Sequence, residues 1–371
     1  MSSRVAKHLG IVLLAAGASA CDTPETSAPG ELVSLAVAPN VTVSSTTDLG
    51  TFGMDHGFGF EINDAGNIAG RTETGVVGLP TALQAVFWFP QGGVTLLPTL
   101  PGGGDSDTRA LNNSNLVTGF SQKTGDVGFQ HHPVVWRVSL GGVEITELGP
   151  FFHGQAEDVN DRGVVVGWYT RTMVFGPPTG FRWSAREGLT GIPPVAGTRS
   201  TAVGINNGGD IVGSSTVPGS GGAEHAVVWW RNGQVTDIGT LGFTAQARSI
   251  NDLGEVAGFG RPCPGCPSEA FFWSEADGII PLGTFGGAQS FSFEIDNRGR
   301  VTGRYDTGVP PMTVQHAFVW TKVTGKLDLP SLGGPGSATG SINARGQTTG
   351  WAEDGSGIRR AVIWQLGPGK P

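Results

Sequence analysis

The chain has 371 residues and a formal net charge of −8, with 62 glycines and 24 prolines. This length is ample for a large core, and an acidic balance without basic clusters excludes nucleic acid and anionic lipid surfaces as partners. Regular helices are excluded too, because no apolar stripe recurs at the helical period and Gly or Pro falls every few positions. Short runs rich in Val, Phe, Trp and Thr between turn residues predict an all-β protein.

Residues 1–20 have the pattern of a secretory signal peptide. Arg4 and Lys7 precede a short apolar run, and the small residues Ala18 to Ala20 form a cleavage site. Cys21 follows directly, so the segment resembles the lipobox of bacterial lipoproteins, in which the Cys is lipidated after cleavage. The first lipobox position holds Ala in place of the usual Leu, and simple secretion is the alternative. We expect an exported protein, lipid-anchored in the cell envelope as a periplasmic or surface protein.

A flexible tether is expected at 21–40, because residues 22–31 contain two prolines and no apolar run. A folded body is expected at 41–366, with a short tail at 367–371. No other segment is long and apolar enough to cross a bilayer as a helix. Contact with a membrane is therefore predicted only through the N-terminal lipid.

A nine-residue stretch, which first covers Ile62 to Gly70, occurs seven times at steps of 45 to 49 residues. Such a period is typical of repeat architectures. The stretch predicts a tight β-hairpin, because its Asn can bond back to the local backbone and its fifth position suits positive φ. That position is Gly in six copies and Asn115 in the other. The last residue is always Gly inside a strand, which indicates a close approach by neighbouring backbone or a large side chain.

Two further signatures share this period. One ends in Trp, and seven of the ten tryptophans occupy its slot: Trp88, Trp136, Trp183, Trp229, Trp273, Trp320 and Trp364. A large ring that recurs once per unit is most simply a packing anchor between units. The other is Leu-Gly-Thr-Phe-Gly or a variant, clear at 48–53, 237–242, 282–286 and 329–333 and weaker near Leu97, Leu148 and Leu189. Each unit then holds about four strands, as in one propeller blade.

The order of the signatures predicts how the ring closes. A Leu-Gly-Thr element precedes the first hairpin, and no such element follows Trp364. A strand at 41–50 is therefore expected to complete the blade made by 342–366, which leaves no open sheet edge. The predicted fold is an all-β, seven-bladed β-propeller. The third unit departs most from the pattern, so its blade is expected to be the irregular one.

The combination of these motifs resembles the HAF repeat family. It includes Ala-Phe-Val-Trp at 317–320, Ile-Gly-Thr-Leu-Gly at 238–242 as a form of the Leu-Gly-Thr-Leu-Gly motif, and the Asn-x-x-Gly hairpin with its closing Gly, and the resemblance spans 48–364. It implies an exported bacterial repeat protein, but it supplies no reaction, ligand, cofactor or catalytic residue. The hairpin alone is also similar to that of regulator-of-chromosome-condensation repeats, which again implies a propeller.

Cys263 and Cys266 lie between the hairpin and the Trp strand of the fifth unit. In an oxidising compartment, two cysteines this close favour a local disulfide that staples a long loop. Redox chemistry would need a helix N-terminus to lower a thiol pKa, and zinc would need two more ligands. The disulfide is the preferred interpretation, with redox, metal-binding and free thiols as alternatives.

Three histidines precede the Trp strand in the second, fourth and sixth units: His132, His225 and His316. They would bind metal only if that slot faced the central channel, and a strand so late in its blade lies far from the axis. Three aspartates occupy hairpin turns without the ligand spacing of a calcium loop: Asp64, Asp161 and Asp252. No metal site and no cofactor are predicted.

Aromatic residues follow the closing Gly in four units: Phe120, Trp168, Phe259 and Trp351. They are candidates for stacking on sugars or peptides, and packing between blades is the alternative.

Motifs for a nucleophile, a phosphate-binding loop or a sialidase-type Asp-box are not found. We therefore expect no catalytic residues and a non-enzymatic scaffold that binds an unknown protein or glycan at the envelope through its longer loops. Six such loops occupy equivalent positions: 71–84, 120–132, 168–179, 214–225, 259–269 and 304–316. The alternatives are a polysaccharide-active enzyme, which needs acidic or basic groups converging at the channel mouth, and a purely structural protein.

Overall fold

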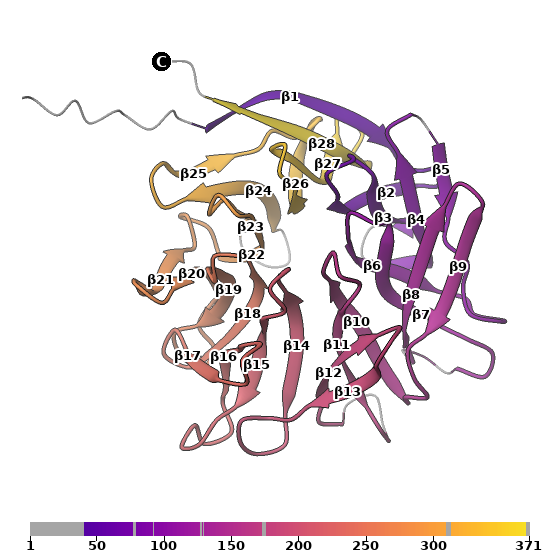
Figure 1. The fold of residues 1–371 in the computed structure, drawn as a ribbon. Coiled ribbons are helices and arrows are strands. Elements are labelled where there is room, and N and C mark those ends of the chain that lie inside the picture. The colour runs from indigo at the N-terminus through magenta and orange to yellow at the C-terminus, as the bar shows by residue number, and fades with distance from the viewer. Residues whose placement is uncertain are drawn as a thin grey trace, which may run out of the picture. The chain divides into compact units, whose positions relative to one another are not determined.

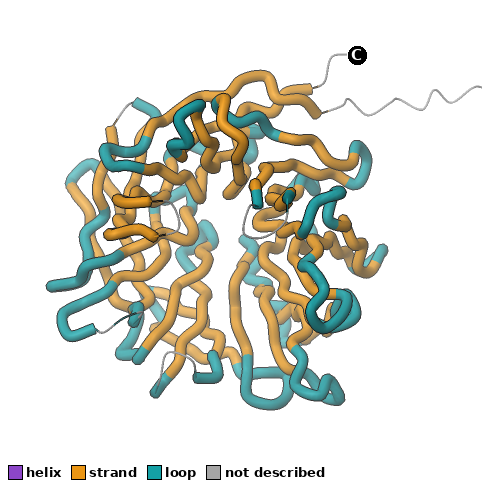
Figure 2. Tube along the Cα trace, turned by 180° about the vertical axis from the view of Figure 1, so that it is seen from behind, coloured by secondary structure: helices purple, strands orange, loops and turns teal. Residues whose placement is uncertain are grey.

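The computed structural model describes residues 41–76, 79–91, 93–126, 128, 130–172, 176–308 and 313–368. The predicted signal peptide, the lipidation site at Cys21 and the tether lie outside the described residues. Figure 2 shows strands joined by loops and turns over the described chain. No helix in this part of the chain is long and apolar enough to span a membrane.

Seven four-stranded antiparallel sheets, here called blades 1 to 7, form a ring (Figure 1). Blade 1 comprises β2 (His56–Ile62), β3 (Ile68–Val76), β4 (Leu79–Phe89) and β5 (Gly93–Leu96). Blade 2 comprises β6 (Ser106–Leu111), β7 (Leu116–Ser121), β8 (His132–Ser139) and β9 (Gly142–Glu147). Blade 3 comprises β10 (His153–Val159), β11 (Val165–Thr170), β12 (Thr179–Ser184) and β13 (Gly188–Ile192). Blade 4 comprises β14 (Ser200–Ile205), β15 (Ile211–Thr216), β16 (Glu224–Trp229) and β17 (Val235–Gly239). Blade 5 comprises β18 (Thr244–Ile250), β19 (Val256–Arg261), β20 (Glu269–Ser274) and β21 (Gly278–Gly283). Blade 6 comprises β22 (Gln289–Ile295), β23 (Val301–Thr307), β24 (Val314–Thr321) and β25 (Gly325–Asp328). Blade 7 comprises β26 (Gly333–Ile342), β27 (Gln347–Asp354), β28 (Arg359–Pro368) and β1 (Val41–Gly50).

Blade 3 is a complete four-stranded sheet. The expectation of an irregular third blade was therefore wrong, because the unusual residues of that unit still allow β12 to pair with both β11 and β13.

The N-terminal strand closes the ring. β1 pairs antiparallel with β28, from Val41 opposite Pro368 to Gly50 opposite Ala361. An ion pair of 2.7 Å between Arg360 and Asp48 links the same two strands. The predicted seven-bladed propeller with an N-terminal strand in its last blade is confirmed. β28 continues to Pro368, so the described start of the expected tail belongs to this strand.

The repeated Asn stretch forms the hairpin between the first and second strands of each blade. In blade 1, the backbone N–H of Gly66 donates to the carbonyl of Asn63 at 2.9 Å, and Asn63 N–H donates to Asn67 at 3.0 Å. The predicted positive φ is confirmed at the fifth position of every copy: Gly66, Asn115, Gly163, Gly209, Gly254, Gly299 and Gly346. These hairpins share one face of the ring, here called the hairpin face. The connections from second to third strands lie on the opposite face, here called the loop face.

The closing Gly of each stretch is required by close packing, as predicted. A Cβ on Gly213 would overlap the carbonyl oxygen of Thr201 on the first strand of the same blade. A Cβ on Gly258 would also lie 2.5 Å from the Phe271 ring. Only Gly lets the first two strands approach this closely beside a third-strand aromatic ring.

The repeated Trp lies on the third strand and packs towards the preceding blade. Trp136 is fully buried against Phe87 and Ala69 of blade 1, and its indole N–H donates to the Pro98 carbonyl at 2.7 Å. Trp364 packs in the same way and donates to Pro330 of the preceding unit at 2.9 Å. The other five also share a hydrophobic cluster with the preceding blade: Trp88, Trp183, Trp229, Trp273 and Trp320.

Candidate functional site: the central channel

The first strand of each blade lines the centre of the ring and carries a β-bulge shortly before its hairpin. One extra residue breaks the alternation of the strand, so that two successive side chains can both reach the channel. The register shift leaves these residues unpaired: Phe60, Arg109, Glu157, Val203, Arg248, Phe293 and Gly340. The seven repeats thus supply seven positions that face the axis.

All seven bulge residues line one cavity of about 230 Å³. A second cavity of about 290 Å³ lies at the hairpin face and is lined by the turn residues. Glu61, Asp158 and Glu294, each directly after a bulge residue, line both cavities. These three carboxyls and the nearby Arg248 are here called the waist. The channel therefore has ionisable groups from blades 1, 3, 5 and 6 where its two cavities meet.

A belt of side-chain amides, here called the inner belt, surrounds the hairpin-face cavity. The side-chain N–H of Asn63 donates to the carbonyl of Asn112 in the next blade at 3.2 Å, and Asn112 donates to Asn160 at 2.9 Å. The same bond recurs from Asn160, Asn206, Asn251 and Asn343 at 2.9–3.1 Å. Each Asn is thus a turn residue and a link between blades at once.

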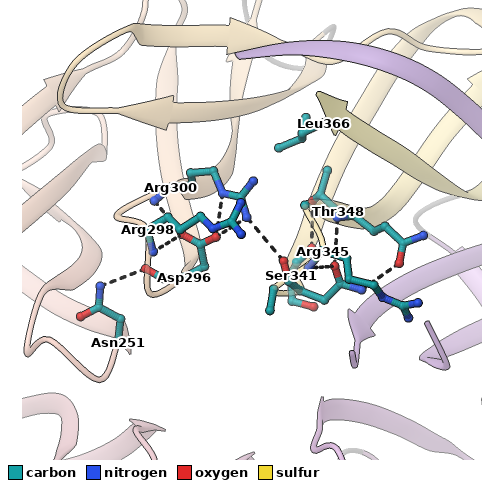
Figure 3. A network of polar contacts seen from close by, with 12 residues as sticks. Asn251, Asp296, Arg298, Arg300, Ser341, Arg345, Thr348 and Leu366 are labelled. Atoms are coloured by element: carbon teal, nitrogen blue, oxygen red, sulfur yellow. Dashed lines mark hydrogen bonds and ion pairs between the residues drawn. The ribbon is translucent and has the colours of Figure 1, made fainter. Parts of the chain in front are cut away.

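Blade 6 keeps this inner belt continuous with different residues (Figure 3). Asp296 replaces the Asn and has no side-chain N–H to donate. Arg300 instead reaches the carbonyl of Asn343 at 3.5 Å, while its Nε donates to Asp296 at 2.7 Å. Arg300 thus supplies the N–H donor that Asp296 lacks, and a hydrogen bond still joins blades 6 and 7.

A second belt of hydrogen bonds, here called the outer belt, joins the residues that follow the inner-belt residues in sequence. The backbone N–H of Asp64 donates to the side chain of Asn113 at 2.8 Å, and Asn113 N–H donates to Asp161 at 2.9 Å. The belt continues through Asn207, Asp252 and Asn297. It breaks only between Asn297 and Ala344, among the described turns, because Ala offers no acceptor. The aspartates predicted as plain turn residues therefore also join neighbouring blades.

Burial raises the pKa of all three waist carboxyls. The pKa of Glu61 lies well above its ordinary value, through burial and then the neighbouring Glu294 and Asp158. The pKa of Glu294 rises to about 8, against a hydrogen bond from Ser249 at 2.6 Å. The pKa of Asp158 rises to about 6, because burial outweighs two backbone N–H bonds that favour its ionised form. Each side chain is half-buried and faces the cavity, so channel water screens part of this effect.

Arg248 is the unpaired cation of the waist. Among the described residues it makes no hydrogen bond and no ion pair, although its charge acts on Glu61 and Asp158. The other two arginines of the cavity have partners. Arg109 lies 3.5 Å from Asp107, and Arg304 lies 3.5 Å from Asp306. Arg248 therefore has donors available for a ligand.

Two of the predicted stacking residues pack within blades 2 and 3. Phe120 is 2% exposed and stacks on His131 with ring centroids 3.7 Å apart. Trp168 lies edge-on to His153 at 5.2 Å and donates its indole N–H to the bulge residue Glu157 at 2.7 Å. Trp168 thus positions a channel carboxylate.

The other two lie at different cavities. Trp351 lines the channel, with the Arg359 guanidinium 4.1 Å above its ring. Phe259 meets Phe291 edge-on at 5.0 Å in a separate loop-face depression between blades 4, 5 and 6. The structure therefore does not bring the four aromatics together in one site.

The three histidines considered as metal ligands lie on separate blades with separate partners. His132 contacts Asp126 and Glu147, each at 3.0 Å. His225 contacts Asp237 at 2.9 Å, and His316 contacts Thr307 at 2.9 Å. Within the described part of the chain, no group of three or more His, Cys, Asp or Glu side chains is arranged to hold a metal ion.

Cys263 and Cys266 are joined in a disulfide, with Cα atoms 5.1 Å apart. The bond ties the connection between β19 and β20 on the loop face. It lies away from the residues that line the channel.

The channel residues were not predicted from sequence. Strict alternation along a strand places neighbours such as Phe60 and Glu61 on opposite faces, and the bulge removes that alternation. One signal was present. The position before the hairpin holds Glu61, Asp158 and Glu294 in three units, where the others have only small residues: Ala110, Gly204, Ser249 and Ser341.

No protein-family model matches this chain, and no curated protein is significantly similar to it. Among solved structures, the propeller domain of the trilobed protease from Pyrococcus furiosus aligns with a TM-score of 0.56 at 8% identity, over 84% of this chain and 95% of that one. Virginiamycin B lyase from Staphylococcus aureus aligns with a TM-score of 0.54 at 10% identity, over 86% of this chain and 99% of that one. A puromycin hydrolase has a TM-score of 0.54 at 11% identity, over 83% of this chain and 51% of that one.

These likenesses concern the fold alone and define the class of protein, a β-propeller. The P. furiosus domain is described as having an open velcro topology, whereas β1 and β28 close the ring here.

Proposed function

We propose that this chain is an exported, HAF-type propeller that binds a small polar ligand in its central channel as a non-enzymatic scaffold of the bacterial envelope. The alignment of seven bulges carries the proposal. It gathers Arg248, Glu61, Asp158 and Glu294 around one cavity of about 230 Å³. Convergent polar groups in a concave, partly apolar site are the usual form of a ligand site.

The channel is a better candidate than the loop aromatics. Phe120 and Trp168 are already engaged by neighbouring side chains. The waist instead contains a cation without a partner among the described residues and carboxyls held away from their ordinary pKa. Shifted ionisable groups cluster at functional sites, because structure alone gains little from them.

A thermal-shift panel of monosaccharides, peptidoglycan fragments and short peptides tests this proposal. A ligand that binds only the folded protein raises its melting temperature by mass action. Val203, which is 5% exposed and lines the cavity, is replaced by Phe to narrow the channel. The matched control is Val235→Phe on β17 of the same blade, where the side chain is 47% exposed. We expect the shift in the wild type and the control but not in Val203→Phe. A shift that persists in Val203→Phe places binding elsewhere.

The waist also favours one second candidate, an enzyme acting on polysaccharide. A protonated Glu294 and an ionised Asp158 in one channel offer a proton donor and a proton acceptor. Release of reducing ends from envelope polysaccharides, abolished in Glu294→Gln, would favour this candidate over binding alone.

The proposed lipid anchor rests on the sequence at Ala18 to Cys21. In a bacterial host, Cys21→Ser should abolish incorporation of labelled fatty acid and move the protein from the membrane fraction to the soluble fraction. Unchanged labelling in Cys21→Ser would contradict lipidation at this residue.

A further inference from the structure

We infer that the channel ligand is a monoanionic sugar acid whose carboxylate binds Arg248. This inference rests on the proposed binding in the channel and names the chemical class that the waist selects. Arg248 comes from the bulge of β18 and lines the cavity together with Glu61, Asp158 and Glu294. A guanidinium presents two parallel N–H donors that match the two oxygens of a carboxylate.

Arg248 is the one arginine lining the cavity that has no hydrogen bond or ion pair to the described residues. Arg109 is held by Asp107 and by Gln155, whose side-chain oxygen accepts from Nε at 3.3 Å. Arg304 is held by Asp306. Because Arg248 has no such partner among the described residues, an anionic ligand group would complete its hydrogen bonds without breaking an existing pair.

The acidic neighbours limit the ligand to a single negative charge. The carboxylate of Asp158 accepts from the backbone N–H groups of Val159 at 2.6 Å and Ile205 at 2.7 Å, two hydrogen bonds that favour its ionised form without Arg248. A dianion such as a phosphate ester would place a second charge near this carboxylate, at a cost that one guanidinium does not offset. A monoanion matches the single charge of Arg248, which has no partner in the part of the chain that the structure describes.

Glu61 and Glu294 add hydrogen-bond donors when protonated. One oxygen of Glu294 accepts from the Ser249 hydroxyl, so the proton is carried by the other oxygen. Burial raises the pKa of Glu294 to about 8, so this acid keeps its proton at neutral pH, and burial raises the pKa of Glu61 in the same direction. Two acids and one guanidinium then offer donors to the oxygens of the ligand.

The walls and the size of the cavity favour a single ring. Phe60, Phe293 and Trp351 line it, and each already has an arginine above its ring. Their remaining apolar surface suits the C–H face of a sugar. A volume of about 230 Å³ lies below the usual range of about 300–1,000 Å³ for ligand sites and accommodates one ring better than a chain segment.

Isothermal titration of the purified chain with glucuronate, glucose and glucose 6-phosphate tests the inference. We expect glucuronate to bind most tightly, and Arg248→Ala to weaken it by roughly 10- to 100-fold, as for loss of a hydrogen-bonded charge. The matched control is Arg261→Ala on β19 of the same blade, an exposed arginine that does not line the channel. An unchanged melting temperature is expected for Arg248→Ala, because no described contact is lost.

A pH series adds an independent readout. The charged and titratable groups that line the cavity come from six strands: Glu61 (β2), Arg109 (β6), Glu157 and Asp158 (β10), Arg248 (β18), Glu294 (β22) and Arg304 (β23). Affinity for glucuronate should fall as pH rises from about 6 to 9, because Glu294, whose pKa is about 8, ionises over this range, stops donating and repels the carboxylate. Affinity that is flat over this range would contradict the role of Glu294.

These outcomes test the sugar-acid inference separately from ligand binding in the channel. No glucuronate binding, equal affinity for glucose and glucuronate, tighter binding of glucose 6-phosphate, or full affinity in Arg248→Ala each overturns the sugar-acid inference. Channel binding itself still stands if Val203→Phe removes binding of whichever panel ligand is found. It fails if every such ligand binds Val203→Phe as well as the wild type.

Discussion

Ionisation of a single residue, Glu294, makes the stability of the folded protein depend on pH. Its folded-state pKa of about 8 lies above the ordinary value of 4.5, so the folded protein keeps a proton that the unfolded chain releases. Stability due to this group is therefore complete below about 4.5 and is lost as pH rises to about 8. Glu294→Gln, which cannot ionise, should melt a few degrees above the wild type at pH 9, and the difference should vanish at pH 4.

The matched control for this prediction is Glu144→Gln on the outer strand β9, where the side chain is exposed. Its melting curve should follow the wild type at every pH. Equal melting of Glu294→Gln and the wild type at pH 9 would show that channel water fully solvates the ionised carboxylate.

Sequence could predict the turn residues but not the residues of the waist. The requirement for positive φ at Gly66 or Asn115 is local, and so is the need for Gly at position 213. The placement of Arg248 depends on a bulge and on the curvature of the whole ring. Neither the bulge nor the curvature of the ring can be recognised from the residues around position 248. The pairing of Asp296 with Arg300 likewise has meaning only beside the carbonyl of Asn343.

The close contact between the first and second strands of a blade is sterically strict. Gly213→Ala on β15 would drive a Cβ into the Thr201 carbonyl, and we expect a loss of about 1–3 kcal/mol in the free energy of unfolding, as for overpacking. Chemical denaturation measures this loss. Gly355→Ala, with open space around the Cβ position, should change stability by less than about 0.5 kcal/mol. Equal effects at the two positions would mean that the strands can move apart at little cost.

Two hydrogen-bonded belts hold the whole ring together at the hairpin face, and the outer belt has one gap. Asn at position 344 could accept from the N–H of Asn297 and donate to Asp64 of the following blade, as Asn113 donates to Asp161 of its following blade at 3.1 Å. Ala344→Asn should therefore stabilise the protein by about 0.5–1.5 kcal/mol per bond formed. Thermal unfolding measures the gain. Ala65→Asn, at an exposed turn position outside the belt, should give none. Destabilisation by Ala344→Asn would mean that the gap is needed.

Closure by β1 is testable by complementation. Deletion of residues 41–50 would leave the edge of β28 unpaired, so we expect a lower melting temperature and concentration-dependent self-association in sedimentation experiments. A synthetic peptide with the sequence of β1 should restore both properties, and a scrambled peptide should not. Restoration by the scrambled peptide would show that the register between β1 and β28 is unimportant.

The pairing of β1 with β28 also sets an order of events during synthesis. Ser44 hydrogen-bonds to Gln365 across a separation of 321 residues. At roughly 5–20 residues per second, β1 is made tens of seconds before its partner exists. Throughout that interval it must stay unpaired without capturing another strand. Six of its ten residues are Ser, Thr or Asp, which favours hydration of the unpaired strand. The strand of the last blade that is made first is thus the one that docks last.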